Sequence, residues 1–214
     1  MSGMKNRAGK PVLLKMVAAI QQNKDYLSEV DGLIGDGDHG MNMNKGFTMF
    51  AGQIRDRDTG FTAGLNDLGN VLFSQIGGSM GPIYGTIFMS MAEAGEKLEE
   101  IDLAGFALML GAGLSALRDI VQAQVGDKTL IDTLSPANDA VQKAAKEGKS
   151  LAEGLREMKA AAEAGRDSTK DLAAKFGRSS RLGERSRGVL DAGAVSCCII
   201  LCAVADGILE QTEA

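Results

Sequence analysis

The chain has 214 residues and a formal net charge of −5, with 44% hydrophobic and 24% charged residues. This composition is typical of a globular protein long enough to bury one core, and it excludes a disordered chain. The acidic balance and the lack of a basic patch argue against nucleic acid or an anionic membrane surface as a partner. We therefore expect a single soluble domain over residues 1–214.

The predicted helices cover most of the chain, because apolar residues recur at steps of three and four and no segment alternates like a strand. Pro11 suits a first helical turn, Ser150 and Glu153 form a capping box, and Gly148 suits a helix end. Pro136 indicates a kink or a split. Short connections favour antiparallel neighbours, so the predicted fold is an all-α bundle of about eight helices. The helices run approximately over residues 11–28, 39–57, 64–76, 82–99, 102–122, 130–147, 150–175 and 192–210.

The three cysteines, Cys197, Cys198 and Cys202, all lie in the apolar run 194–205. An odd number of thiols in one segment does not form a disulfide framework, and a reducing compartment fits best. The first ten residues lack the apolar stretch of a signal peptide, and the apolar run is too short to span a bilayer. The sequence therefore predicts a cytoplasmic protein in which this run is a buried core helix.

Four polar, glycine-rich segments separate the predicted helices, at residues 31–40, 77–81, 126–129 and 177–193. They follow the first, third, fifth and seventh helices. If the helices alternate up and down, all four segments fall at the same end of the bundle. The sequence thus predicts one site built from four loops.

Three aspartates mark the first segment: Asp31, Asp36 and Asp38. In an extended stretch, residues two apart point to the same side, so Asp36 and Asp38 can converge. Three carboxylates with no cysteine form a hard, oxygen-rich site that favours Mg²⁺ or Ca²⁺, and two Mg²⁺ ions bridging a polyphosphate would neutralise them. The alternative is that Asp36 and Asp38 only cap the next helix, which does not explain the glycines beside them.

The other segments suggest phosphate contacts. Residues 77–81, which include Gly78, Ser79, Met80 and Gly81, lead into a helix N-terminus and predict a phosphate site. His39, the only histidine, and Asn42 one turn later are candidate ligand contacts, although each has a structural alternative. Among the clustered arginines we choose Arg178 to stabilise charge during phosphoryl transfer. Residues 126–129, including Thr129, either line a nucleoside or cap the sixth helix.

These motifs, taken together, resemble the L subunit of dihydroxyacetone kinases. The matching segments are GDGDHG at 35–40 with Asn42 and Met43, GGSMG at 77–81 with Tyr84–Thr86, GDKT at 126–129, LGERS at 182–186, and Asp191 with Gly193 and Ala194. They occur in the family's order and span nearly the whole chain.

The resemblance implies a barrel of eight antiparallel helices that holds ADP or ATP at one end, with Mg²⁺ on Asp31, Asp36 and Asp38. It implies an enzyme subunit that passes the γ-phosphoryl group to a short ketose bound by a partner K subunit, with ATP or a phosphotransferase-system protein as donor. The implied nucleotide contacts are His39, Asn42, Ser79, Met80, Leu130, Arg178, Asp191 and Gly193.

The sequence departs from the family pattern mainly near the GDKT segment, where Val121–Val125 lack the usual Gly and Pro and Leu130 replaces a Met. The family's Asp-Pro-Gly is here Asp191-Ala-Gly. These departures leave dihydroxyacetone and erythrulose both open as substrates. A second hypothesis is a nucleotide-dependent signalling module that binds a transcription regulator.

Overall fold

The computed structural model describes residues 3–212, and in that range the chain folds into nine α-helices with one minor sheet, which confirms the all-α prediction. Strands β1 (Met4–Lys5) and β2 (Glu100–Ile101) pair antiparallel. Two-residue strands carry no alternation that a sequence pattern could reveal. The helices are α1 (Lys10–Gln22), α2 (Lys24–Ile34), α3 (His39–Ile54), α4 (Phe61–Gln75), α5 (Met80–Gly95), α6 (Leu103–Ile120), α7 (Ile131–Lys146), α8 (Leu151–Ser168) and α9 (Ala192–Thr212).

The first predicted helix, 11–28, is in fact two helices. Helix α1 ends at Gln22, and the side-chain amide of Asn23, which caps it, donates to the Ala19 carbonyl of the last turn at 2.8 Å. Helix α2 then starts at once and continues to Ile34. Asp31 consequently lies on a helix, where its backbone is fixed, and not in the loop that follows.

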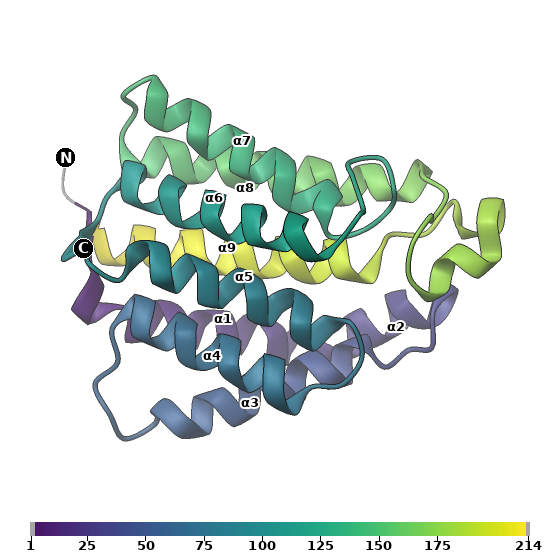
Figure 1. Cartoon of the computed structure of the whole chain (residues 1–214), viewed down its shortest axis with the longest axis horizontal. Helices are drawn as coiled ribbons and strands as arrows, with labels where there is room; N and C mark the ends of the chain where they lie inside the picture. Colours follow the sequence, from purple (N-terminus) through teal and green to yellow (C-terminus); the bar gives the residue numbers. More distant parts are fainter. Residues whose placement is uncertain (1–2, 213–214) are drawn as a thin grey trace.

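The helices pack side by side along one axis, with α9 between the α6–α8 group and the α1–α4 group (Figure 1). Thirteen of the 21 residues of α9 are buried, which confirms the prediction of an apolar core helix. Helices α6 and α9 are long and apolar enough to pass a test for membrane spans, but 50% and 72% of those windows are buried by neighbouring helices. Burial of this kind is expected for core helices of a bundle.

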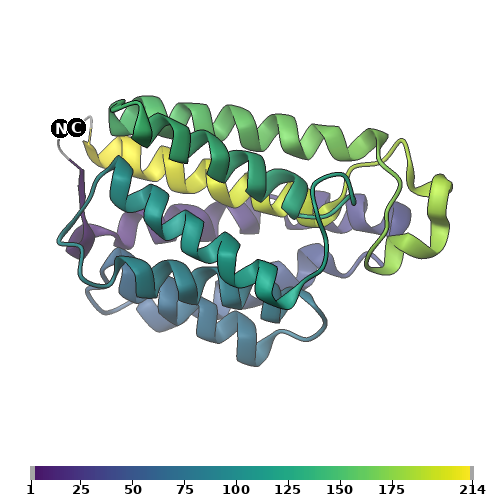
Figure 2. The ribbon, with the colours of Figure 1, turned by 45° about the horizontal axis from the view of Figure 1, so that its top comes forward.

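The connections α2–α3, α4–α5, α6–α7 and α8–α9 all lie at the end of the bundle away from the chain termini (Figures 1 and 2). These are the four glycine-rich connections. The alternation of helix direction therefore places them together, as the sequence predicts.

One expected split is absent, and one helix end differs from the prediction. Helix α7 is continuous through Pro136, without a split, and the Asp132 carbonyl that a proline leaves without its helical donor faces Gly165 of α8. Helix α8 stops at Ser168, where a 3₁₀ turn over Thr169–Asp171 begins the long connection to α9. The capping box of Ser150 and the helix end at Gly148 are confirmed.

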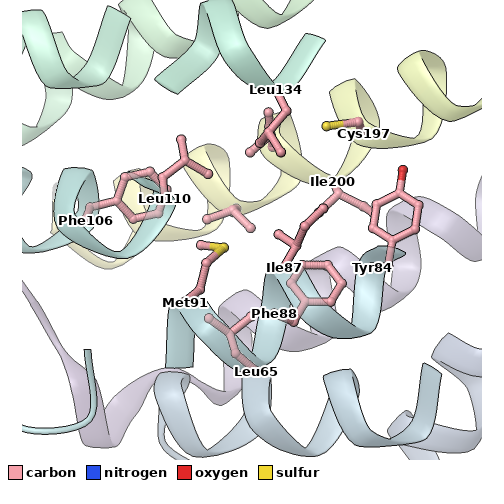
Figure 3. A pocket seen from close by; sticks show the side chains of 12 residues that line it. Leu65, Tyr84, Ile87, Phe88, Met91, Phe106, Leu110, Leu134, Cys197 and Ile200 are labelled. Atoms are coloured by element: carbon pink, nitrogen blue, oxygen red, sulfur yellow. The ribbon is translucent and has the colours of Figure 1, made fainter. Parts of the chain in front are cut away.

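Side chains from α4, α5, α6, α7 and α9 surround an apolar cavity of about 20 Å³ in the core (Figure 3). A cavity needs roughly 10–15 Å³ of such space to hold a single water molecule. The cavity is therefore far too small for a nucleotide, and the candidate site is the loop-bearing end of the bundle.

Candidate functional site

The structure brings the three aspartates together. One carboxylate oxygen of each of Asp31, Asp36 and Asp38 lies within 4.8 Å of the other two. The reason differs from the prediction, because residues 36–38 are not extended. Gly37 has a φ of 77°, in the left-handed region, and Asp38 is near helical geometry at φ −91° and ψ −11°. The turn folds both carboxylates back over the last turn of α2.

The capping alternative is wrong for Asp38. This residue precedes α3, yet its side chain makes no capping hydrogen bond. Its carboxylate is exposed beside the other two. The helix cap therefore does not explain why the acidic residue is there.

Arg178 reaches the acidic cluster from the 3₁₀ segment Arg178–Ser186 and forms an ion pair with Asp36. The three carboxylates repel one another at this spacing, and the guanidinium offsets part of their negative charge. Three carboxylates with open coordination positions match the oxygen ligands that Mg²⁺ prefers. The residues present thus fit a divalent cation.

The second segment leads into α5 as expected. Gly78 has a φ of 73°, and Ser79 precedes the helix without a side-chain capping bond. Gly81 packs against the end of α4, where an added Cβ would come 2.2 Å from the Ile76 carbonyl oxygen. The N–H groups of Met80 and Gly81, at the start of α5, lack carbonyl partners within the helix and are suited to an anion.

His39 points into the protein. Its Nε2 lies 2.8 Å from the Ser196 hydroxyl, which lies 2.6 Å from the Tyr84 hydroxyl. Burial lowers the pKa of His39 to about 4, against the opposing effect of Asp31. Sequence reasoning assigned no role to Ser196 or to the Tyr84 hydroxyl. The signal was available, since Ser196 is the single hydroxyl in the apolar run 194–205.

The third segment is organised by a buried lysine that sequence reasoning also left without a role. Lys128 is fully buried, has a φ of 61°, and donates to the carbonyls of Thr169 and Val189. Desolvation lowers its pKa. The lysine thereby ties the third segment to the connection between α8 and α9.

Thr129 and Leu130 directly precede α7. The Asp132 carboxylate accepts from the backbone N–H groups of Thr129 and Gly126 at 2.7 and 2.6 Å, and the Thr129 hydroxyl accepts from Ile131 N–H at 3.2 Å. The capping role of this segment is therefore present. Leu130 is buried, 7% exposed, so only its edge is available to a ligand.

Asp191 and Gly193 lie at the start of α9. The Asp191 carboxylate accepts from Ala194 N–H at 2.8 Å, while burial raises its pKa to about 6 in spite of that bond and of Lys128. A Cβ on Gly193 would lie 3.6 Å from Leu130, so the third and fourth segments touch here. Asn42 is partly buried on the first turn of α3.

The sequence matches the DAK2 domain family over residues 33–206. The chain belongs to this family. It is 36% identical over 185 residues to the ADP-binding subunit of a PEP-dependent dihydroxyacetone kinase of Listeria innocua, covering 85% of this chain and 86% of that subunit. The corresponding subunit of Escherichia coli is 35% identical over 175 residues, covering 80% of this chain and 82% of that one.

The DAK2 fold is also found in the dihydroxyacetone kinase of C. freundii. Its native crystal structure matches 96% of this chain with a TM-score of 0.71 at 22% identity. This chain covers 36% of that longer enzyme, whose structure is also known in complex with AMP-PNP and Mg²⁺. At this identity the likeness shows that the two share a fold.

Proposed function

We propose that this chain is the nucleotide-binding subunit of a dihydroxyacetone-type kinase. The observation that carries the proposal is the convergence of Asp31, Asp36 and Asp38 beside a helix N-terminus at one end of a DAK2 bundle. In this proposal residues 1–214 act as one domain. The relatives named above, which are ADP-binding subunits covered over most of their length, support the same assignment.

In the proposed complex Asp31, Asp36 and Asp38 would hold Mg²⁺, as two ions, for the phosphates of ADP or ATP. The metal would supply charge neutralisation at the β- and γ-phosphates. Residues Gly78, Ser79, Met80 and Gly81 bind phosphate oxygens through the open N-terminus of α5. The nucleoside end is formed by Thr129, Leu130, Asp191 and Gly193, and the remaining contacts come from His39 and Asn42.

Arg178 is the proposed catalytic residue. Its guanidinium forms an ion pair with Asp36, and we expect it to turn to the γ-phosphate once a cation binds the Asp36 carboxylate. A ketose hydroxyl oxygen then bonds to the γ-phosphorus while the bond to the bridging oxygen breaks, and the hydroxyl proton leaves to the partner or to water. The chain contributes positioning and charge, because little covalent chemistry falls to the protein.

The proposed partner is a substrate-binding K subunit that carries dihydroxyacetone or another short ketose such as erythrulose. The proposed donor is ATP or a phosphotransferase-system protein that phosphorylates bound ADP. The proposed setting is the cytoplasm. The test mixes the purified chain with candidate K subunits, either ketose and either donor, and measures ketose phosphate. We expect product only when both subunits are present, and a complete absence of product in every combination would reject the kinase assignment.

Calorimetry on Asp36→Asn tests the metal separately. We expect affinity for Mg–ADP to fall at least about tenfold, because one of three anionic ligands is lost. Asp56→Asn, an exposed aspartate near the opposite end, is the matched control and should bind normally. Equal affinity of the Asp36 variant and the control would show that the metal lies elsewhere.

A further inference from the structure

Three helices contribute to a buried chain of hydrogen bonds behind the acidic cluster. Ser196 of α9 is fully buried and Tyr84 of α5 is 3% exposed, while His39 begins α3. Figure 3 shows the Tyr84 hydroxyl at the end of the ring that points away from the apolar cavity lining. Buried polar groups in an apolar core are costly unless they are hydrogen-bonded, so each of these three side chains needs a hydrogen-bond partner.

The ring of His39 is oriented by these contacts. Its Nε2 faces the Ser196 hydroxyl at 2.8 Å, so Nδ1, on the side of the ring nearer the backbone, is left for the site. The backbone N–H of the same residue lies 3.4 Å from the Asp31 carboxylate. His39 therefore lies beside the acidic cluster, and Nδ1 is the ring nitrogen that Ser196 leaves available to the proposed phosphates.

The hydroxyl hydrogens decide which nitrogen carries the proton. Each hydroxyl has one hydrogen. If Tyr84 donates to Ser196 at 2.6 Å, the Ser196 hydrogen is left for its next shortest contact, which is Nε2 of His39 at 2.8 Å. The Gly193 carbonyl, 3.1 Å from Ser196 and 3.2 Å from Tyr84, is the longer alternative. A ring that accepts at Nε2 must carry its proton at Nδ1.

The opposite tautomer fits a phosphate poorly. It would present the Nδ1 lone pair to anionic oxygens, whereas the Nδ1–H tautomer presents a donor. We propose that Ser196, supported by Tyr84, is a positioning residue that keeps the His39 proton on Nδ1 for donation to a phosphate oxygen of the nucleotide. This inference rests on the proposed function for its ligand, but the tautomer can be measured without it.

The test exploits the fact that His39 is the only histidine in the chain. A long-range ¹⁵N–¹H spectrum of ring-labelled protein at neutral pH then reports one imidazole without assignment. We expect the Nδ1–H pattern in the wild-type chain, a mixture of tautomers in Ser196→Ala, and a smaller change in Tyr84→Phe. We also expect Ser196→Ala to weaken Mg–ADP binding about threefold to tenfold, from partial loss of one charge-assisted hydrogen bond.

Thr133→Val is the matched control. The Thr133 hydroxyl is also buried and donates to the Ala194 carbonyl of α9 at 3.1 Å, but it does not touch the histidine. The control should keep the wild-type tautomer and affinity while losing a comparable hydrogen bond. This comparison separates positioning of the ring from general loosening of α9.

The Nε2–H tautomer or a doubly protonated ring in the wild-type chain would overturn the inference. So would an unchanged tautomer and affinity in Ser196→Ala. Failure of the proposed function would look different: the wild-type chain would show the Nδ1–H ring but bind no Mg–ADP. That result would retain the positioning of the ring and reject the phosphate as its partner.

Discussion

Asp191 is a carboxyl group whose pKa is set mainly by burial. Burial raises its pKa to about 6, although Ala194 N–H and Lys128 favour the ionised form. The carboxyl group thus holds its proton more tightly in the folded chain than in the unfolded chain, where the pKa is near 3.8. Ionisation of Asp191 therefore lowers the free energy of unfolding.

The sign of the resulting pH dependence follows from proton binding. Between about pH 4 and pH 6 the folded state binds more protons than the unfolded state, so the free energy of unfolding falls as pH rises. Asp191→Asn should remove this decline, which amounts to at most about 3 kcal/mol for a shift of roughly two pKa units. Urea titrations of both proteins across this range measure it, and parallel pH profiles would contradict the prediction.

At the scale of elements, the contact between α2 and α3 fixes the geometry of the aspartates. Gly40, in the first turn of α3, packs so closely on α2 that an added Cβ would lie 1.9 Å from the Lys24 carbonyl oxygen and 2.7 Å from Ser28 N. Backbone atoms cannot move aside as a flexible side chain can. The close approach of these two helices brings Asp31 on one to Asp36 and Asp38 beside the other.

Gly40→Ala should therefore push the helices apart and weaken both folding and the acidic site. We expect a loss of about 2–3 kcal/mol in the free energy of unfolding, as for other overpacked positions, together with weaker Mg–ADP binding. Gly52→Ala on the same helix is the control, because its Cβ would meet nothing within 4 Å. Helix propensity predicts that the control is stabilised by up to about 1 kcal/mol.

Chemical denaturation of the two variants and calorimetry with Mg–ADP provide the measurements. Equal stability for the two alanine variants would mean that α2 and α3 adjust without cost. In that case the spacing of the aspartates would not depend on the glycine contact.

At the scale of the whole molecule, the up-and-down alternation of the helices could be predicted from the sequence, because it follows from periodic apolar residues and short loops. The meeting of four loops at one end followed from counting alone. The break at Asn23, inside the polar run Gln21–Asp25, was not predicted, because Ile20 and Leu27 are seven residues apart and keep the apolar stripe in helical register across that run. The network of His39, Ser196 and Tyr84 was not readable either, because its partners lie 157 and 112 residues apart along the chain.

The loop-bearing end also exposes apolar side chains close to the acidic cluster. Leu33 on α2 is 62% exposed and Met41 on α3 is 55% exposed, two and three residues from Asp31 and Asp38 respectively. A K subunit must bring its ketose to the γ-phosphate at this end if the proposed function holds. Exposed apolar side chains at the loop-bearing end are suited to pack against that subunit.

The double variant Leu33→Gln and Met41→Gln should therefore weaken binding of the K subunit while leaving Mg–ADP binding unchanged. Loss of two buried apolar contacts predicts roughly tenfold weaker association or more. The measurement is the rate of ketose phosphorylation as the K subunit is titrated, which should require more partner to reach the same maximum.

Leu108→Gln is the control for that titration. Leu108 has the same 55% exposure as Met41 but lies on the first half of α6, toward the opposite end of the bundle. Because a rigid K subunit that reaches the phosphates is expected to leave this residue in solvent, the control should titrate like the wild-type chain. If the control and the double variant shift the curve equally, the shift does not depend on where the apolar side chain was replaced. The K subunit must then approach the nucleotide from another side of the loop-bearing end.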